Sequence, residues 1–224
     1  MNRIFSYDSK FSRIMIKLCY ACFLNLLWML CSLPIFTIGA STTALWYASL
    51  KIVRDQEYNA AGLFFRSFKQ NFKQATVLWL ILFAAGLFLG GDIWILLHLR
   101  TAATGAPAVF WTLLLALVIA ASVIYMIILL WVFPLLASVE NTNLAMLKNS
   151  FLIGTHYLFA TILMFAIYFA MAYVIISVFT PMFLMGEGLC VLLCSWLTDR
   201  VLRSVTYDPD EDRGPETEAA DVQG

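Results

Sequence analysis

Charged side chains are scarce in this chain, and their scarcity excludes a water-soluble globular protein. Of the 224 residues only 12% are charged, whereas 62% are hydrophobic. A soluble domain of that composition would expose large apolar patches. The lipid bilayer is therefore the expected surroundings of most of the chain. Nucleic acid is not an expected partner, because the formal net charge is zero.

Histidines are few in the sequence, and a phosphate-binding loop is absent from it. The only histidines are His98 and His156, which the topology below places on opposite sides of the membrane, so they cannot share an acid–base or metal site. The glycines Gly86, Gly90 and Gly91 lie in an apolar run, and no Lys-Ser or Lys-Thr follows them. They are expected to permit close helix packing instead.

The five cysteines are spaced as redox or metal pairs would be in a soluble protein. Cys19 and Cys22 form one pair, Cys190 and Cys194 another, and Cys31 stands apart. All lie in apolar runs without a neighbouring histidine or carboxylate, so they are interpreted as buried thiols that act as small apolar side chains. No cofactor, metal ion or catalytic residue is expected, and the chain is not expected to be an enzyme.

Long apolar runs fill most of the chain and predict an all-α, polytopic membrane helix bundle. Crossing a hydrocarbon core of about 30 Å takes about 20 residues of helix. Five runs approach that length, and any charge in them lies towards an end. They are 18–38, 77–97, 109–132, 158–178 and 182–197.

The distribution of Lys and Arg predicts one further, short helix. Segment 1–17 carries four basic residues and segment 39–74 carries five, so the positive-inside rule places both in the cytoplasm. One crossing cannot join two segments on the same side. A second helix at 40–53 that returns to the cytoplasm after a turn at 34–39 resolves the conflict.

The remaining connections then alternate. Segment 98–108 is expected outside, 137–157 inside, and 180–181 forms an outer turn. The prediction is six membrane helices in the cell membrane, with both termini cytoplasmic. Five helices with the N-terminus outside are the alternative.

The short helix at 40–53 needs its own explanation. Its 14 residues rise only about 21 Å, so it would need snorkelling of Lys51 and Arg54, local bilayer thinning, or burial against neighbours. It can also be re-entrant. Around it, the sequence divides into a basic cytoplasmic segment 1–17, a membrane domain 18–203 and a disordered acidic tail 204–224.

An amphipathic helix is predicted at 59–73, lying in the headgroup plane. Aromatic side chains recur there at helical spacing beside a basic ridge. These residues are the candidate partner-docking surface: Phe65, Arg66, Phe68, Lys69, Phe72 and Lys73. The alternative is an interfacial helix that only orients the bundle.

Polar residues inside apolar runs give the candidate solute site. Asp92 and Glu187 are the two acids in the runs, and an ionisable group in hydrocarbon costs several kcal/mol, from about 2.5 upwards, unless it is paired or hydrated. Together they would frame a cation or polar-solute site; alternatively each reaches the outer interface. Asn25, mid-way along the first run, is expected to bridge two helices by a hydrogen bond.

A short motif around the first turn carries a family resemblance. It comprises Asn25, Trp28, Pro34, Thr37 and Gly39, followed by a basic loop rich in phenylalanine. This stretch resembles the YesL family of bacterial multi-helix membrane proteins, which are grouped as a domain of unknown function. In structural terms, Pro34 would end a helix, Gly39 would supply a tight turn, and Thr37 would satisfy backbone groups freed there.

The resemblance implies a function that the residues alone do not. Members of that family are commonly encoded beside ABC-type carbohydrate uptake systems. The expected function is thus a non-enzymatic accessory or scaffold protein for carbohydrate uptake, with sugar ABC transporter subunits, and a second copy of the chain, as partners. An autonomous small-solute transporter or channel is the first alternative, and an intramembrane enzyme the second.

Overall fold

The computed structural model describes residues 10–56, 59–102, 105–177 and 183–206, and within them the regular structure is entirely helical. The all-α class is confirmed. Segment 1–9, most of the acidic tail (207–224) and the turn at 180–181 lie outside the described residues. The elements are α1 (Lys10–Cys31), the 3-10 turn η1 (Ile35–Thr37), α2 (Ile38–Val53), α3 (Ala60–Ala102), α4 (Ala106–Leu136), α5 (Asn143–His156), α6 (Leu158–Ser177) and α7 (Phe183–Thr206).

The first apolar run, 18–38, ends as a helix at Cys31 and continues into the turn that leads to the antiparallel helix α2. α1 ends at Cys31, because Pro34 lacks a backbone donor and disfavours helix in the residue before it. The Thr37 hydroxyl lies 2.6 Å from the carbonyl of Cys31 and 2.7 Å from that of Pro34. At the other end of the hairpin, Lys17 Nζ donates to the carbonyl of Val53 at 3.3 Å. The returning helix predicted at 40–53 is thus present as α2.

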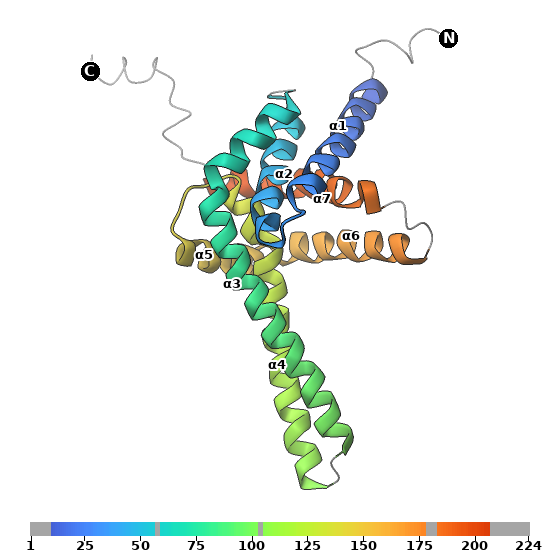
Figure 1. Ribbon diagram of the computed structural model, residues 1–224, viewed down its shortest axis with the longest axis vertical. Helices are drawn as coiled ribbons and strands as arrows, with labels where there is room; N and C mark the ends of the chain where they lie inside the picture. Colours follow the sequence, from blue (N-terminus) through green and yellow to red (C-terminus); the bar gives the residue numbers. More distant parts are fainter. Residues whose placement is uncertain (1–9, 57–58, 103–104, 178–182, 207–224) are drawn as a thin grey trace, which may run out of the picture.

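α2 is enclosed by other helices rather than by lipid. Its 16 residues rise about 24 Å, less than the hydrocarbon thickness. Eleven of them are buried, against α1, α3, α4 and α7, and α2 lies at the centre of the bundle (Figure 1). Burial against neighbours is therefore how this short helix is accommodated.

The segment 59–73, expected to be an interfacial amphipathic helix, is helical from Ala60 onwards but is the first part of a longer helix. α3 runs without a break from Ala60 to Ala102, so 59–73 and 77–97 share one axis. The physical reason is local, since no proline or glycine lies between Gly62 and Gly86 to bend the helix. If 77–97 crosses the membrane, the basic start of α3 cannot lie flat in the headgroup plane.

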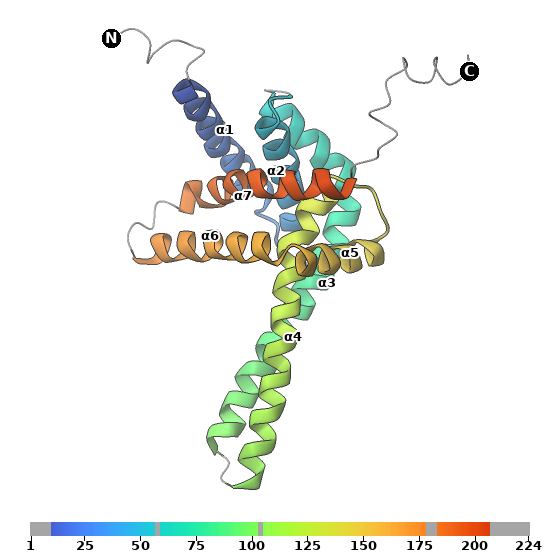
Figure 2. The same ribbon diagram turned by 180° about the vertical axis from the view of Figure 1, so that it is seen from behind.

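The helices do not form six near-parallel spans. Three helices in the described residues, fewer than the six predicted, are long and apolar enough to cross a membrane: α3, α4 and α6. α3 and α4 pair as a long hairpin, whose far end projects from the bundle, and α6 and α7 run steeply across it (Figures 1 and 2). Membrane helices tilt by about 0–40°, so α6 and α4 cannot both lie along the membrane normal in this arrangement.

Four polar contacts tie together the segments that the charge rule places inside. Lys17 pairs with Asp55 at 2.9 Å, joining the start of α1 to the end of α2. Arg54 pairs with Asp199 of α7. Gln74 Nε2 donates to the carbonyl of Asn141 at 2.5 Å, at the α4–α5 connection. The fourth is a 2.9 Å hydrogen bond between the hydroxyls of Tyr157 and Ser204, at the start of α6 and the end of α7.

Candidate functional site

Asn25 joins α1 to α7 at the middle of the bundle. Its side chain is wholly buried, and its Oδ1 accepts a hydrogen bond from the backbone N–H of Gly188 at 2.8 Å. Gly188 permits the approach, because a Cβ there would collide with the backbone oxygen of Ala21. Asn25 therefore bridges two helices, and a side chain bonded in this way has a structural role before any role in solute binding.

Glu187 lies one residue away from this junction. It is half-buried, and the hydroxyl of Tyr168 on α6 donates to its Oε1 at 3.3 Å. The carboxylate lines a partly open cavity of about 330 Å³, to which α1, α2, α3, α4, α6 and α7 all contribute side chains. We call it the aromatic cavity; its lining is Trp28, Ile38, Thr42, Trp46, Trp79, Met126, Leu129, Leu130, Phe133, Phe165, Tyr168 and Glu187.

The walls of the aromatic cavity have few free polar groups. Trp28 Nε1 donates to Thr42 Oγ1 at 3.0 Å, and Trp79 Nε1 donates to the carbonyl of Ile35 at 2.8 Å. Two of the three indole N–H groups in the described lining are thereby committed to bonds that tie the chain together. Among the described residues of the lining, Glu187 carries the only carboxyl group, and none is basic.

Asp92 is not part of this site. The Tyr125 hydroxyl bonds to the carbonyl of Leu82 at 3.0 Å, where α3 and α4 are still close to the bundle. Asp92 lies ten residues further along α3, which is about 15 Å of helix. The predicted three-residue site of Asn25, Asp92 and Glu187 therefore does not form as a unit: the bundle brings Asn25 and Glu187 together and leaves Asp92 on the projecting hairpin.

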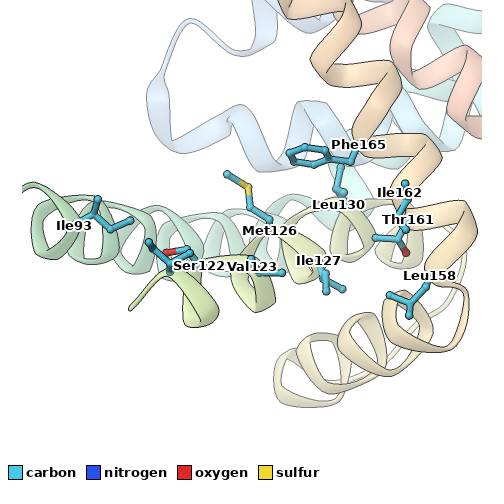
Figure 3. A pocket seen from close by; sticks show the side chains of 11 residues that line it. Ile93, Ser122, Val123, Met126, Ile127, Leu130, Leu158, Thr161, Ile162 and Phe165 are labelled. Carbon is cyan, nitrogen blue, oxygen red and sulfur yellow. The ribbon is translucent and has the colours of Figure 1, made fainter. Parts of the chain in front are cut away.

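A second hollow lies in the angle between the α3–α4 hairpin and α6 (Figure 3). Its volume is about 440 Å³, and its side chains come from Ile93 of α3, several residues of α4, and Leu158 to Phe165 of α6. The two hydroxyls in it are already bonded: Ser122 donates to Val118 at 2.8 Å and Thr161 donates to Gly154 at 2.8 Å. This hollow suits hydrocarbon and has no group for chemistry.

The predicted docking residues divide between the two faces of α3. Phe68 and Phe72 are half-buried against the core, in a row of rings in which the centroids of Phe64 and Phe68 lie 6.2 Å apart. Four others are exposed, and we call them the basic ridge: Phe65, Arg66, Lys69 and Lys73. The ridge is the part of the predicted surface that a partner can reach.

Two residues of the turn motif act differently from the expectation. Gly39 lies inside helix α2 rather than in a tight turn, and a Cβ there would come within 2.5 Å of the backbone oxygen of Ala75 and the Cβ of Trp79. Its smallness permits close packing of α2 on α3. Trp28 closes the hairpin through its bond to Thr42, a role that sequence position alone did not reveal.

The cysteines and histidines form no metal centre within the described ranges. All five thiols are free, with Cys190 and Cys194 buried and Cys19 exposed. His98 bonds to the carbonyl of Trp94 at 2.8 Å on its own helix, and His156 is exposed at the end of α5.

The sequence analysis missed the aromatic cavity. The sequence carries only a weak signal for it: Trp and Tyr favour the ends of membrane helices, so Trp46, in the middle of the predicted helix 40–53, and Tyr168, in the middle of the run 158–178, are candidates for an interior role. Trp79, near the start of its run, and Phe133, just beyond the run 109–132, give no such signal. Only the packing of six helices shows that the four face one another.

Comparison with known proteins finds a family model that matches part of the chain and whose function is unknown. The model of a family described as a protein of unknown function, DUF624, matches residues 21–93. The matched part holds α1 from Ala21, α2 and most of α3, and it stops before Tyr168 and Glu187. No curated protein and no solved structure matches the chain. The match agrees with a domain of unknown function; the narrower YesL resemblance stays a prediction.

Proposed function

We propose that the chain is a non-enzymatic membrane protein that assists an ABC-type carbohydrate importer and contacts it through the basic ridge. The link to carbohydrate uptake rests on the family resemblance. The contact surface rests on one observation: the start of α3 is anchored by one face and presents Arg66, Lys69 and Lys73 on another.

The two faces at the start of α3 have different surroundings. Phe64 is fully buried, and Phe68 and Phe72 pack against the core. Phe65, by contrast, is 44% exposed beside the three basic side chains. An aromatic ring among cationic groups is a frequent composition of protein interfaces. The ridge therefore suits an acidic segment on the importer's inner face.

The proposed orientation places the ridge in the cytoplasm. Two ion pairs join the end of α2 to α1 and to α7, and two hydrogen bonds join α3 to the α4–α5 connection and the start of α6 to the end of α7. These contacts support a shared side for the segments that each of them joins. α1 to α4 alternate in direction, and α6 and α7 form a hairpin that returns. Both termini then lie on the same side, whether the chain crosses six times or the α6–α7 hairpin stays within the membrane.

The test is co-purification from native membranes in mild detergent. The tagged chain should enrich sugar ABC permease subunits, and the double variant Lys69→Glu with Lys73→Glu should lose them. Arg100→Glu is the matched control, because Arg100 is exposed at the other end of the same helix. Absence of importer subunits, or their equal recovery with the double variant, would contradict the proposal.

Anionic lipid headgroups are a competing ligand for the basic ridge, and the same double variant distinguishes them from a protein partner. Lys and Arg beside a membrane also attract anionic headgroups, at about 1 kcal/mol each. If the ridge only binds lipid, the double variant keeps every protein partner and loses only affinity for anionic vesicles. That result would count against docking.

A second candidate function is an autonomous small-solute transporter or channel, which the aromatic cavity favours. A cavity lined by side chains of six helices, with one carboxyl group among its described residues, is a typical place for a solute site in a membrane bundle. The pair that an intramembrane enzyme would use, Asp92 and Glu187, is separated in the structure and gives that alternative no support.

A further inference from the structure

We propose that the aromatic cavity binds a small quaternary ammonium cation, with Glu187 as its counter-charge. This deepens the second candidate function and is independent of the basic ridge. The proposal follows from three properties of the side chains that line the cavity: their charge, their aromatic surfaces and their few oxygen atoms.

The charge of the lining selects a cation. Glu187 is surrounded by aromatic and aliphatic side chains, and no Lys, Arg or His is among the described residues of the cavity wall. A buried carboxylate in such surroundings is costly, so the group either takes up a proton or pairs with an opposite charge that approaches it. An anionic solute would meet the same carboxylate with no compensating group, so anions are excluded.

The surfaces of the lining favour an organic cation. Six aromatic side chains from five helices face the cavity; they are Trp28, Trp46, Trp79, Phe133, Phe165 and Tyr168. Ring faces attract cations, Trp most strongly, and cages of such rings are the usual means of recognising quaternary ammonium groups. Since the indole N–H groups of Trp28 and Trp79 already donate to Thr42 and Ile35, these rings offer π surface rather than donors.

The scarcity of side-chain oxygen atoms in the described lining disfavours Ca²⁺, Mg²⁺ and primary ammonium ions. Ca²⁺ takes 6–8 oxygen ligands, and Mg²⁺ demands an octahedral shell. A primary ammonium has three N–H donors to satisfy. The lining offers the Glu187 carboxylate, the Tyr168 hydroxyl that donates to it, and the Thr42 hydroxyl that already accepts from Trp28. A quaternary ammonium group has no N–H donor and needs only the charge and the rings.

The volume of the cavity limits the size of the ligand. At about 330 Å³ it stands at the lower end of the range of about 300–1,000 Å³ for small-molecule pockets. A head group with a short chain fits better than a drug-sized cation. Choline and tetramethylammonium are therefore the probes.

The experiment is calorimetric titration of the purified full-length chain in a maltoside detergent, which carries no choline group of its own. Choline chloride should bind saturably, and so should tetramethylammonium chloride. The uncharged carbon analogue 3,3-dimethylbutan-1-ol, which has the shape of choline without its charge, should bind at least about tenfold more weakly. This comparison uses the native protein and stays decisive if a variant fails to fold.

Two variants complete the design. Glu187→Gln keeps the shape of the side chain and removes the charge, and it should weaken choline binding at least about tenfold. Asp92→Asn removes the other acid of the apolar runs, outside the cavity, and should leave the affinity unchanged. The proposal is overturned if choline does not saturate, if the carbon analogue binds equally well, or if folded Glu187→Gln binds choline like the native chain.

The titration measures binding alone, so binding and transport can be judged separately. If choline binds but does not cross proteoliposomes that contain the chain, the cation site stands and the transporter function fails. If choline does not bind, the cation site fails even where some other solute is transported.

Discussion

α2 and the projecting end of the α3–α4 hairpin are both strongly apolar, yet they have opposite surroundings. We call residues 83–102 of α3 and 105–124 of α4 the distal arm. α2 is buried along most of its length, whereas in the described part of the distal arm only Leu96 and Leu115 are buried. Hydrophobicity therefore identifies the membrane domain but does not tell protein-facing from lipid-facing helix.

The difference lies in the size and polarity of the side chains. α2 is rich in small and hydroxyl residues, such as Ala40, Ser41, Thr43 and Ala44, which are all buried. Small residues let backbones approach, and hydroxyls can bond within the helix, as Thr43 does to the carbonyl of Gly39 at 2.9 Å. The distal arm instead exposes large side chains that suit lipid: Leu87, Phe88, Trp94, Val109, Phe110, Leu113 and Leu117.

The largest expected effect comes from filling a close helix contact. Gly188→Leu places a side chain against the backbone of Ala21 and the Cβ of Asn25. A Cβ alone at position 188 would already lie 2.9 Å from the Cβ of Asn25. The bundle should lose about 3 kcal/mol of stability or fail to assemble. Thermal denaturation in detergent, followed by size-exclusion chromatography, measures the loss.

Gly90→Leu is the matched change in the distal arm. Nothing lies within 4 Å of a Cβ added at Gly90, and leucine favours helix over glycine by up to about 1 kcal/mol. Stability should be unchanged or slightly higher. A loss at Gly90 as large as that at Gly188 would contradict the division of the molecule into a packed bundle and a lipid-facing arm.

An intermediate effect is expected at the α1–α2 turn. Thr37→Val removes the hydroxyl that bonds to the carbonyls of Cys31 and Pro34, and the cost should be about 1–2 kcal/mol because Thr37 is buried. Thr112→Val, at an exposed position of the distal arm where the hydroxyl bonds only within its own helix, should cost less. The same thermal measurement applies, and equal losses would show that the turn is not specially stabilised.

The smallest effect concerns two arginines that share Asp199. Arg54 is 22% exposed and joins α2 to α7, whereas Arg203 is 63% exposed and pairs with Asp199 within α7 at 3.0 Å. Arg54→Ala should cost about 1 kcal/mol and Arg203→Ala under about 0.5 kcal/mol. A reversed order in thermal stability would show that the link between helices contributes nothing beyond an exposed pair.

The sequence predicted the helices better than their surroundings. The return of the chain at Pro34 and the extra helix at 40–53 followed from charge counting and proline chemistry, since both depend on local composition. The bridging of α1 and α7 by Asn25 could be anticipated because a buried amide needs a partner. The residue that provides it, Gly188, could not, because it lies 163 positions away.

Two features depended on packing that no local pattern encodes, whereas the continuity of α3 follows from the absence of proline and glycine between Gly62 and Gly86. The first is the steep crossing of α6 over α4, which a count of apolar runs does not predict. The aromatic cavity drew its walls from six helices, so Trp28, Trp79 and Glu187 gained a shared role only in the folded bundle.

The most direct test of the contrast between α2 and the distal arm is photolabelling of the unmodified protein in liposomes with a lipid-dissolved diazirine. Residue-level mass spectrometry identifies the labelled positions. The account predicts dense labelling of exposed residues in the distal arm, such as Phe88, Trp94 and Leu113, and almost none along α2 from Ile38 to Val53. Labelling of α2 at the level of the distal arm would contradict the account, because it would place α2 against lipid rather than at the centre of the bundle.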